Sequence, residues 1–177
     1  SGIEASVLAS LADISLKRGD QENSLKLHRQ ALEIFVSIED AVGAARTYNN
    51  MGYIFRRRGE ISLAKEAYEN VEEILNMEKD DELLHSRILL ARSWLEMGEV
   101  EKARAHALKS HEDTIEHADR SLHARARAVL GRFYAKTGDA DLALHHYSDA
   151  LEQMGQEGDP VSLVETTLLL GEVLEDS

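Results

Sequence analysis

The sequence predicts an all-α protein built from antiparallel helix hairpins. Three observations lead to this prediction. Glycines and aspartates of the kind found at helix ends recur about every 40 residues, and apolar residues between them are spaced three and four apart. The chain also has a single proline among 177 residues. Strand-rich domains need more turn residues and more β-branched runs than this chain contains. Hydrophobic residues make up 43% of the chain, which suits one compact domain or one short repeat array.

Two kinds of residue mark the repeat. A glycine followed by an acidic residue recurs with spacings of 40, 39 and 40, at Gly19, Gly59, Gly98 and Gly138. Aspartates recur out of phase with the same steps, at Asp40, Asp80, Asp119 and Asp159. Glycine favours the left-handed conformation that ends a helix, and aspartate is a good N-cap for the next one. Each unit is therefore expected to be a helix A, a tight turn, a helix B and a short loop.

The small and aromatic residues of the repeats resemble the tetratricopeptide repeat (TPR). The second repeat carries the pattern at Tyr48, Met51, Gly52, Phe55, Ala64, Tyr68 and Val71. The fourth carries it at Leu130, Gly131, Tyr134, Ala143, Tyr147 and Ala150. Repeat three departs from it with Ala107 and Ser110, and repeat one with Ser15, Ser24 and His28. In such repeats the small residues let the two helices approach closely, and the aromatic rings fill the space beside them.

The resemblance covers essentially the whole chain and implies a right-handed superhelical solenoid of four repeats plus a fifth helix A. The step near 40 residues exceeds the usual length of about 34. Long-helix repeats of this kind are similar to those of kinesin light chains, Pins-type adaptors, and Rap-type and MalT-type bacterial regulators. Those families use the array to hold a peptide or another protein domain, in some cases under the control of a small ligand.

We expect a single array over residues 3–177. The repeats are expected at about 3–40, 41–80, 81–119 and 120–159, followed by a capping or truncated helix at 160–177. Residues 1–2, Ser-Gly, resemble a tag remnant. A helix A without its helix B, in a chain without an initiating methionine, predicts an excised fragment of a longer protein. The unpaired helix would also expose Leu168, Leu169, Val173 or Leu174, which predicts self-association through this helix.

Basic residues are segregated along the expected helices A. The chain has a formal net charge of −13. Helices A of repeats two to four, expected at 41–58, 82–97 and 121–137, nevertheless carry ten of its 20 lysines and arginines and only two of its 33 acids. Cations at helix C-termini gain about 0.3–1 kcal/mol from the helix dipole, which is sufficient to explain Arg56–Arg58. The dipole does not explain Arg46 or Arg92, which lie earlier in their helices.

The TPR register implies which of these side chains line the concave groove. The expected groove residues are Arg46, Asn49, Asn50, Tyr53, Arg56, Arg57, His85, Ile88, Leu89, Arg92, Arg125, Arg132 and Lys136. Arg58, Arg87 and Arg127 are expected to point elsewhere. The stretch "NNMG" is similar to sequences in which asparagine bonds the backbone of an extended partner, and Asn50 matches that position. The other repeats have no asparagine there, which argues against a long threaded peptide.

No catalytic, metal or cofactor site is expected, because no phosphate loop, nucleophile elbow or convincing acid pair is present. The chain contains no cysteine, which excludes disulfides and fits a reducing, cytoplasmic location. His106, His111 and His117 are spaced five and six apart, so they do not share one helical face. The adjacent His145 and His146 point in two directions. The histidines are therefore expected to be solvated or packed, without a metal.

These observations favour a non-enzymatic module that binds an acidic peptide or helix in a basic concave groove. A regulatory or sensory domain of a transcription regulator or signalling ATPase is the alternative. RNA binding by a helical repeat is a third and weaker hypothesis, because the acidic remainder of the chain would repel a polyanion. No span approaches the roughly 20 apolar residues that a transmembrane helix needs, so no membrane partner is expected.

Overall fold

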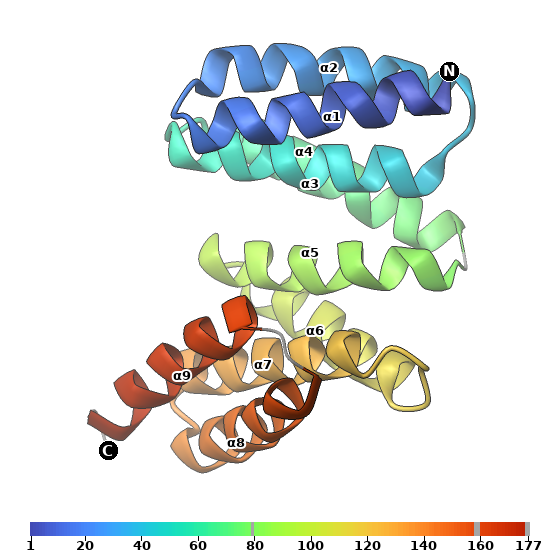
Figure 1. Ribbon diagram of the computed structural model, residues 1–177. Coiled ribbons are helices and arrows are strands. Elements are labelled where there is room, and N and C mark those ends of the chain that lie inside the picture. Colours follow the sequence, from blue (N-terminus) through green and yellow to red (C-terminus); the bar gives the residue numbers. More distant parts are fainter. Residues whose placement is uncertain (79, 158–159, 176–177) are drawn as a thin grey trace. The chain divides into compact units, whose positions relative to one another are not determined.

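The computed structural model describes residues 1–78, 80–157 and 160–175, and every regular element in these ranges is helical (Figure 1). The elements are α1 (Gly2–Lys17), α2 (Gln21–Ser37), α3 (Ala41–Arg57), α4 (Ile61–Met77), the one-turn 3-10 helix η1 (Asp81–Leu83), α5 (Leu84–Glu96), α6 (Val100–Thr114), α7 (Arg120–Thr137), α8 (Ala140–Glu157) and α9 (Pro160–Glu175). None of the described helices is long and apolar enough to cross a membrane.

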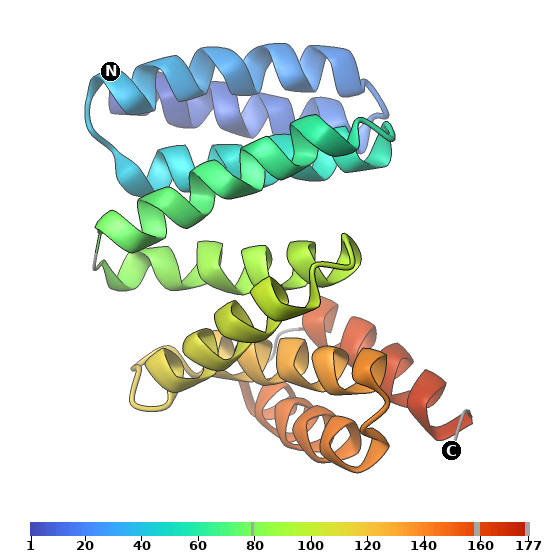
Figure 2. The same cartoon turned by 180° about the vertical axis from the view of Figure 1, so that it is seen from behind.

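The chain divides into two compact units, Ser1–Ser86 and Arg87–Ser177, with the division inside α5. In the first unit α1 packs against α2, α2 against α3, and α3 against α4. In the second unit α6 packs against α7, α7 against α8, and α8 against α9, as both ribbon views show (Figures 1 and 2). Within each unit, consecutive helices therefore form the antiparallel hairpins that the sequence predicts.

Four glycines end the helices A in the conformation expected from the sequence. Their φ angles are positive: 85° at Gly19, 75° at Gly59, 78° at Gly98 and 86° at Gly138. An L-residue with a side chain rarely adopts this left-handed conformation, and glycine adopts it without steric cost. The amide of the acidic residue that follows each glycine donates to a carbonyl in the last turn of helix A, as Glu60 does to Phe55 at 2.9 Å. The helix A to helix B turn is thus set locally.

Aspartates begin several helices, also as expected. Asp40 Oδ1 accepts a hydrogen bond from the Gly43 amide at 2.8 Å and caps α3. Asp119 Oδ1 accepts from Ser121 at 2.9 Å at the start of α7. Asp80 caps η1 and not α5 directly, so one extra 3-10 turn precedes the third helix A. The fourth predicted cap, Asp159, lies outside the described residues.

Each of two hairpins is closed by a glycine that faces a buried tyrosine. A Cβ atom placed on Gly52 would lie 2.4 Å from Cε1 of Tyr68, and one placed on Gly131 would lie 2.7 Å from Cδ1 of Tyr147. Both tyrosines are almost fully buried. Only a residue without a Cβ permits this approach, since real Cβ contacts are not so short. The TPR pairing of a small residue on helix A with an aromatic ring on helix B is therefore present in both units.

Gly131→Ala is expected to destabilise the second unit, because its methyl group must displace the buried ring of Tyr147. Overpacking of this kind costs about 1–3 kcal/mol. The matched control is Gly155→Ala on α8, where the added methyl meets no atom within 4 Å. Alanine also improves helix propensity in both variants, by up to about 1 kcal/mol. The difference between their free energies of unfolding, measured in urea by circular dichroism, isolates the steric cost. Equal stability of the two variants would contradict the close approach.

Candidate functional site

A small groove in the second unit brings together side chains of three helices that the TPR pattern assigns to helix A. It encloses about 70 Å³ and is lined from α5, α7 and α9, with Met154 of α8 beneath. Its apolar surface comes from Ile88, Leu89, Val129, Met154 and Leu169. Ile88 and Val129 also belong to the buried core between α5, α6 and α7, which fixes their positions. The floor of the groove is therefore a rigid part of the fold.

Three arginines and one glutamate form the polar rim of this groove: Arg92, Arg125, Arg132 and Glu165. Arg92 lies on α5, Arg125 and Arg132 lie on α7, and Glu165 lies on α9. The arginines were all expected from the sequence to line a groove. Glu165 was not among the expected groove residues. The structure places that acid among the cations.

Arg92 and Arg132 share the same two carboxylates. Arg92 contacts Oε1 of Glu96 through Nε at 3.2 Å and Oε1 of Glu165 through Nη2 at 2.5 Å. Arg132 contacts the same oxygens, Glu96 Oε1 at 3.4 Å and Glu165 Oε1 at 3.8 Å. Two positive and two negative groups thus alternate around a ring. We call these four residues the ion-pair ring; its formal charge is zero.

The electrostatics of Arg92 reflect this ring. Burial disfavours its charged form, but the charges of Glu165 and Glu96 and their hydrogen bonds outweigh burial, so the pKa of Arg92 is raised from its ordinary value. The guanidinium is therefore held as a cation within the groove. Two of the predicted groove cations are already neutralised by acids of the same unit.

Arg125 differs from the other two groove arginines. Its guanidinium lines the groove, and no hydrogen bond or ion pair joins it to any residue in the described part of the chain. Lys136, the remaining cation predicted on α7, is exposed, and its Nζ lies 3.4 Å from the Leu95 carbonyl oxygen. Lys136 lines a neighbouring hollow with Arg132 and Glu172. Arg125 is thus the groove cation that remains available to a ligand.

In the first unit, two of the predicted groove residues form polar contacts within the fold. Asn49 is buried, and its side-chain nitrogen donates to the Ser86 carbonyl at 3.2 Å. This asparagine was expected to face the groove and instead holds the start of α5 against α3. Asn50 donates to Oδ1 of Asp13 at 3.1 Å, which joins α3 to α1. Its amide is therefore engaged by an acid of this chain.

A cationic cluster surrounds Tyr53 near the end of α3. The guanidinium carbons of Arg56 and Arg57 lie 5.6 and 5.8 Å from the centroid of the Tyr53 ring. Arg57 Nη1 also donates to the Tyr53 hydroxyl at 3.3 Å. Arg46 is exposed on the same helix, and His85 is half-buried at the start of α5. These residues give the first unit a basic surface of its own.

The arginines expected to lie outside the groove are paired elsewhere. Arg58 contacts Glu60 at 2.6 Å, Arg87 contacts Asp113 at 3.8 Å, and Arg127 contacts Asp149 at 2.5 Å. On α9, Leu168 and Leu174 are exposed, as the sequence suggested for an unpaired helix, whereas Val173 is buried against Tyr147.

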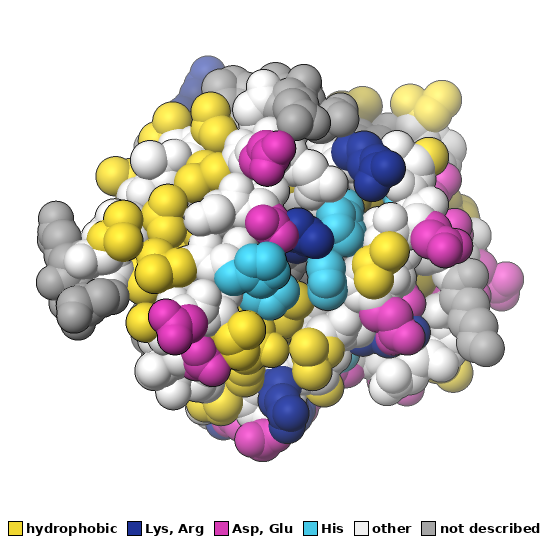
Figure 3. All heavy atoms as spheres, turned by 90° about the horizontal axis from the view of Figure 1, so that it is seen from below, with side chains coloured by type: hydrophobic (Ala, Val, Ile, Leu, Met, Phe, Trp, Pro, Cys, Tyr) yellow, Lys and Arg dark blue, Asp and Glu magenta, His cyan; other side chains and the backbone are white. Residues whose placement is uncertain are grey.

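Three helices of the second unit bring histidines together, which the sequence spacing did not predict. The ring of His111 on α6 stacks on His123 of α7 with centroids 5.1 Å apart, and meets the ring of His146 on α8 at 5.9 Å. His146 in turn stacks on Tyr134 at 5.4 Å. Figure 3 shows histidine side chains gathered on one face of the molecule beside a basic and an acidic side chain.

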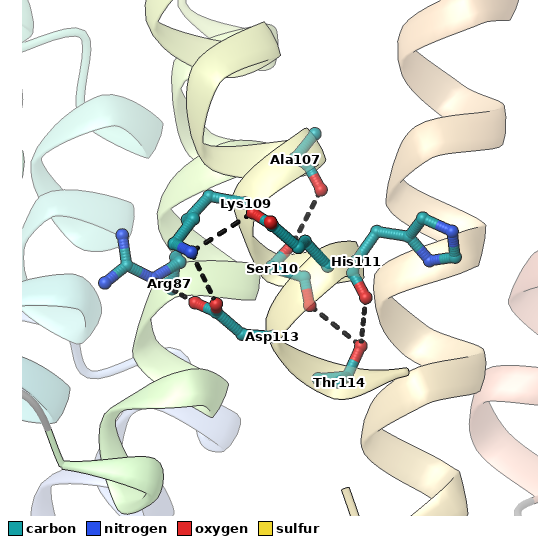
Figure 4. A network of polar contacts seen from close by, with 8 residues as sticks. Arg87, Ala107, Lys109, Ser110, His111, Asp113 and Thr114 are labelled. Atoms are coloured by element: carbon teal, nitrogen blue, oxygen red, sulfur yellow. Dashed lines mark hydrogen bonds and ion pairs between the residues drawn. The ribbon is translucent and has the colours of Figure 1, made fainter. Parts of the chain in front are cut away.

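The surroundings of these rings disfavour their protonation. Burial is the main cause that lowers the pKa of His111, His123 and His146, and the charge of Arg127 lowers all three further. In Figure 4, His111 points away from Lys109 and Asp113, which pair at 2.8 Å on the other side of α6. Among the residues that the structure describes, no group of three or more histidine or acidic side chains could hold a metal ion. The cluster is a packed one.

Comparison with known proteins agrees with the repeat pattern. Residues 4–77 match the family model of the tetratricopeptide repeat. Among curated protein sequences, none matches the chain significantly. Among solved structures, BtubC (BKLC) from P. vanneervenii is similar with a TM-score of 0.79 and 24% identity, over 98% of this chain and 73% of that one.

Two further similar structures belong to larger proteins. The apo form of RapI has a TM-score of 0.69 and 18% identity, over 99% of this chain and 50% of RapI. A signal transduction ATPase with a tetratricopeptide repeat sensor, from Pyrococcus horikoshii, has a TM-score of 0.74 and 16% identity, over 97% of this chain and 26% of that protein. This chain thus spans half of one and about a quarter of the other. At these identities the likeness shows the fold, which confirms the TPR resemblance.

Acidification is expected to destabilise the protein below about pH 6.5, the ordinary pKa of histidine. The folded-state pKa values of His111, His123 and His146 are lowered, so the unfolded chain binds more protons as the pH falls through this range. Burial also lowers the pKa of His28 in the first unit, against the opposing charge of Asp13. The contribution of these neutral histidines to the free energy of unfolding is thus fully present above this range and is lost as the pH falls below it.

His146→Phe is the test, because phenylalanine keeps an aromatic ring against Tyr134 and does not titrate. The loss of unfolding free energy on acidification, from urea titrations at several pH values, should be smaller in this variant than in wild type. Leu130→Ala is the control: it removes a buried aliphatic group and should lower stability by a similar amount at every pH. An unchanged pH dependence in His146→Phe would refute the role of the cluster.

Proposed function

We propose that this chain, with its tetratricopeptide-repeat fold, is a protein-interaction module that binds an acidic peptide or helix, and that the groove of the second unit is the main contact. TPR repeats typically mediate interactions between proteins. The groove supports this use, because it combines an apolar floor at Ile88, Leu89 and Val129 with arginines from two helices. An aliphatic side chain of the partner would lose water against the floor, and its acids would meet the rim.

The unpaired state of Arg125, within the part of the chain that the structure describes, is the single observation that carries the proposal. It lines the groove without an ion pair to any described residue, whereas the neighbouring Arg92 and Arg132 are neutralised by Glu96 and Glu165. A carboxylate of the partner would therefore pair first with Arg125. Charge complementarity of this kind sets the orientation of a partner and its rate of association.

The first unit has a basic surface that we propose as a second contact. Tyr53, Arg56 and Arg57 form its cationic cluster, and Arg46 is exposed about two to three helical turns earlier on α3. Asn50 remains a proposed contact only if a partner replaces its bond to Asp13. We expect this surface to bind acidic segments independently of the groove, and the module to act in the cytoplasm without catalysis.

A regulatory or sensory domain of a larger protein is the second candidate. The likeness to RapI and to the sensor-bearing signal transduction ATPase favours it, since the chain spans only part of each. In that case the groove would clasp a neighbouring domain of the same polypeptide. Binding of RNA is less favoured, because the net charge of −13 would oppose a polyanion. Self-association is the remaining proposal, through the exposed Leu168 and Leu174 of α9.

Arg125→Glu is expected to weaken binding of an acidic partner at least tenfold, because it replaces the available cation with a repelling charge. The probe is a fluorescently labelled helical peptide of glutamate and leucine, measured by anisotropy at low and physiological salt. Wild-type affinity should fall as salt rises. A second peptide with lysine in place of glutamate should not bind.

Arg104→Glu is the matched control, since Arg104 is exposed on α6 outside the groove and the charge change is identical. It should keep the wild-type affinity within about twofold. Circular dichroism melts of both variants establish that they are folded. Equal affinity of Arg125→Glu and wild type would overturn the assignment of the groove, and tight binding of a labelled RNA that both variants share would favour nucleic acid.

A further inference from the structure

The two carboxylates of the ion-pair ring differ in how firmly the fold holds them. Glu96 lies on the same helix as Arg92, one turn away, and its side chain is 16% exposed. Glu165 comes from α9, and its side chain is 43% exposed. An exposed ion pair contributes about 0–1 kcal/mol, because water screens it and the side chains lose freedom in forming it. Glu165 is therefore the member that can leave at little cost.

The helix that carries Glu165 does not depend on this carboxylate. Thr166 is buried, and its hydroxyl lies 3.6 Å from the sulfur of Met154. Val173 packs into a cluster with Ala143 and Tyr147 of α8. Because these contacts hold α9 against α8, the Glu165 side chain can rotate towards solvent while the helix stays in place.

The spacing of the groove arginines defines what could replace that carboxylate. Arg125 and Arg132 are seven residues apart on α7, which is about two helical turns and roughly 10.5 Å along one face. Leu89 and Val129 line the groove that these arginines border. A helical partner matches this arrangement when it carries two acids seven residues apart and leucines between them on the same face.

We propose that Glu165 occupies the anion position formed by Arg92 and Arg132 when no partner is bound, and that an acidic side chain of a helical partner displaces it while a second acid pairs with Arg125. This proposal rests on the proposed function and deepens it, because it names both the recognition pattern and an internal competitor. Glu165 keeps the two arginines neutralised in the free protein. A partner with a single acid gains only Arg125, and a partner with two correctly spaced acids gains the full site.

Glu165→Gln is the test, because glutamine keeps the size of the side chain and removes the competing charge. The probe is a labelled helical peptide with glutamates seven residues apart and leucines at the third and fourth positions after the first glutamate. Its affinity is expected to rise about fivefold over wild type, the factor that corresponds to removal of one exposed ion pair. A peptide with glutamine in place of the second glutamate should show no such gain.

Glu172→Gln is the matched control on the same helix, since it makes the same change in net charge outside the ion-pair ring. The affinity of Glu172→Gln for the same peptide should stay within about twofold of wild type. An equal gain in both variants would overturn the proposal in favour of net charge alone. Wild-type affinity in Glu165→Gln would also overturn the proposal. If Arg125→Glu nevertheless abolishes binding of the peptide, the proposed function still holds. Absence of binding to folded wild type and to both glutamine variants would overturn the proposed function together with this inference.

Discussion

The close approach of helix A to helix B is the constraint on which the hairpins depend. Gly52 and Gly131 each face a buried tyrosine ring at a distance that admits no Cβ atom. Because the ring fills the space between the helices, the rotation of helix A about its own axis is fixed. Arg125 and Arg132, which lie about a third of a turn around α7 from Gly131, are consequently presented at defined positions. The backbone of a groove assembled from such helices is therefore preorganised, which reduces the cost of ordering on binding.

Charge is arranged on two levels in this molecule. Along the sequence, basic residues gather on helices A, although the chain as a whole is acidic. In space, the second unit neutralises part of this charge with Glu96 and Glu165. A count of charges therefore overstates the positive potential of the groove. Arg125 is unpaired among the described residues, whereas Arg92 is paired. This difference appears only in the tertiary structure.

The histidine cluster shows a different use of polar residues. His111, His123 and His146 behave as packed rings, and their lowered pKa values keep them neutral where the α6, α7 and α8 helices meet. Neutral imidazoles can stack against one another and against Tyr134, whereas several imidazolium ions beside Arg127 would repel. We therefore expect the packing of these three helices to depend on pH.

The sequence by itself determined the helices, their ends and the pairing within hairpins, because the responsible signals are local: a left-handed glycine, an aspartate cap, an apolar period, and a small residue matched to an aromatic one. It also predicted Arg92, Arg125 and Arg132 as groove residues, and these three line the small groove of the second unit. Only the tertiary structure decided that Asn49 is buried and that Glu165 reaches Arg92 and Arg132. These contacts join separate helices, and side-chain reach across such an interface depends on how the helices pack, which no local spacing encodes.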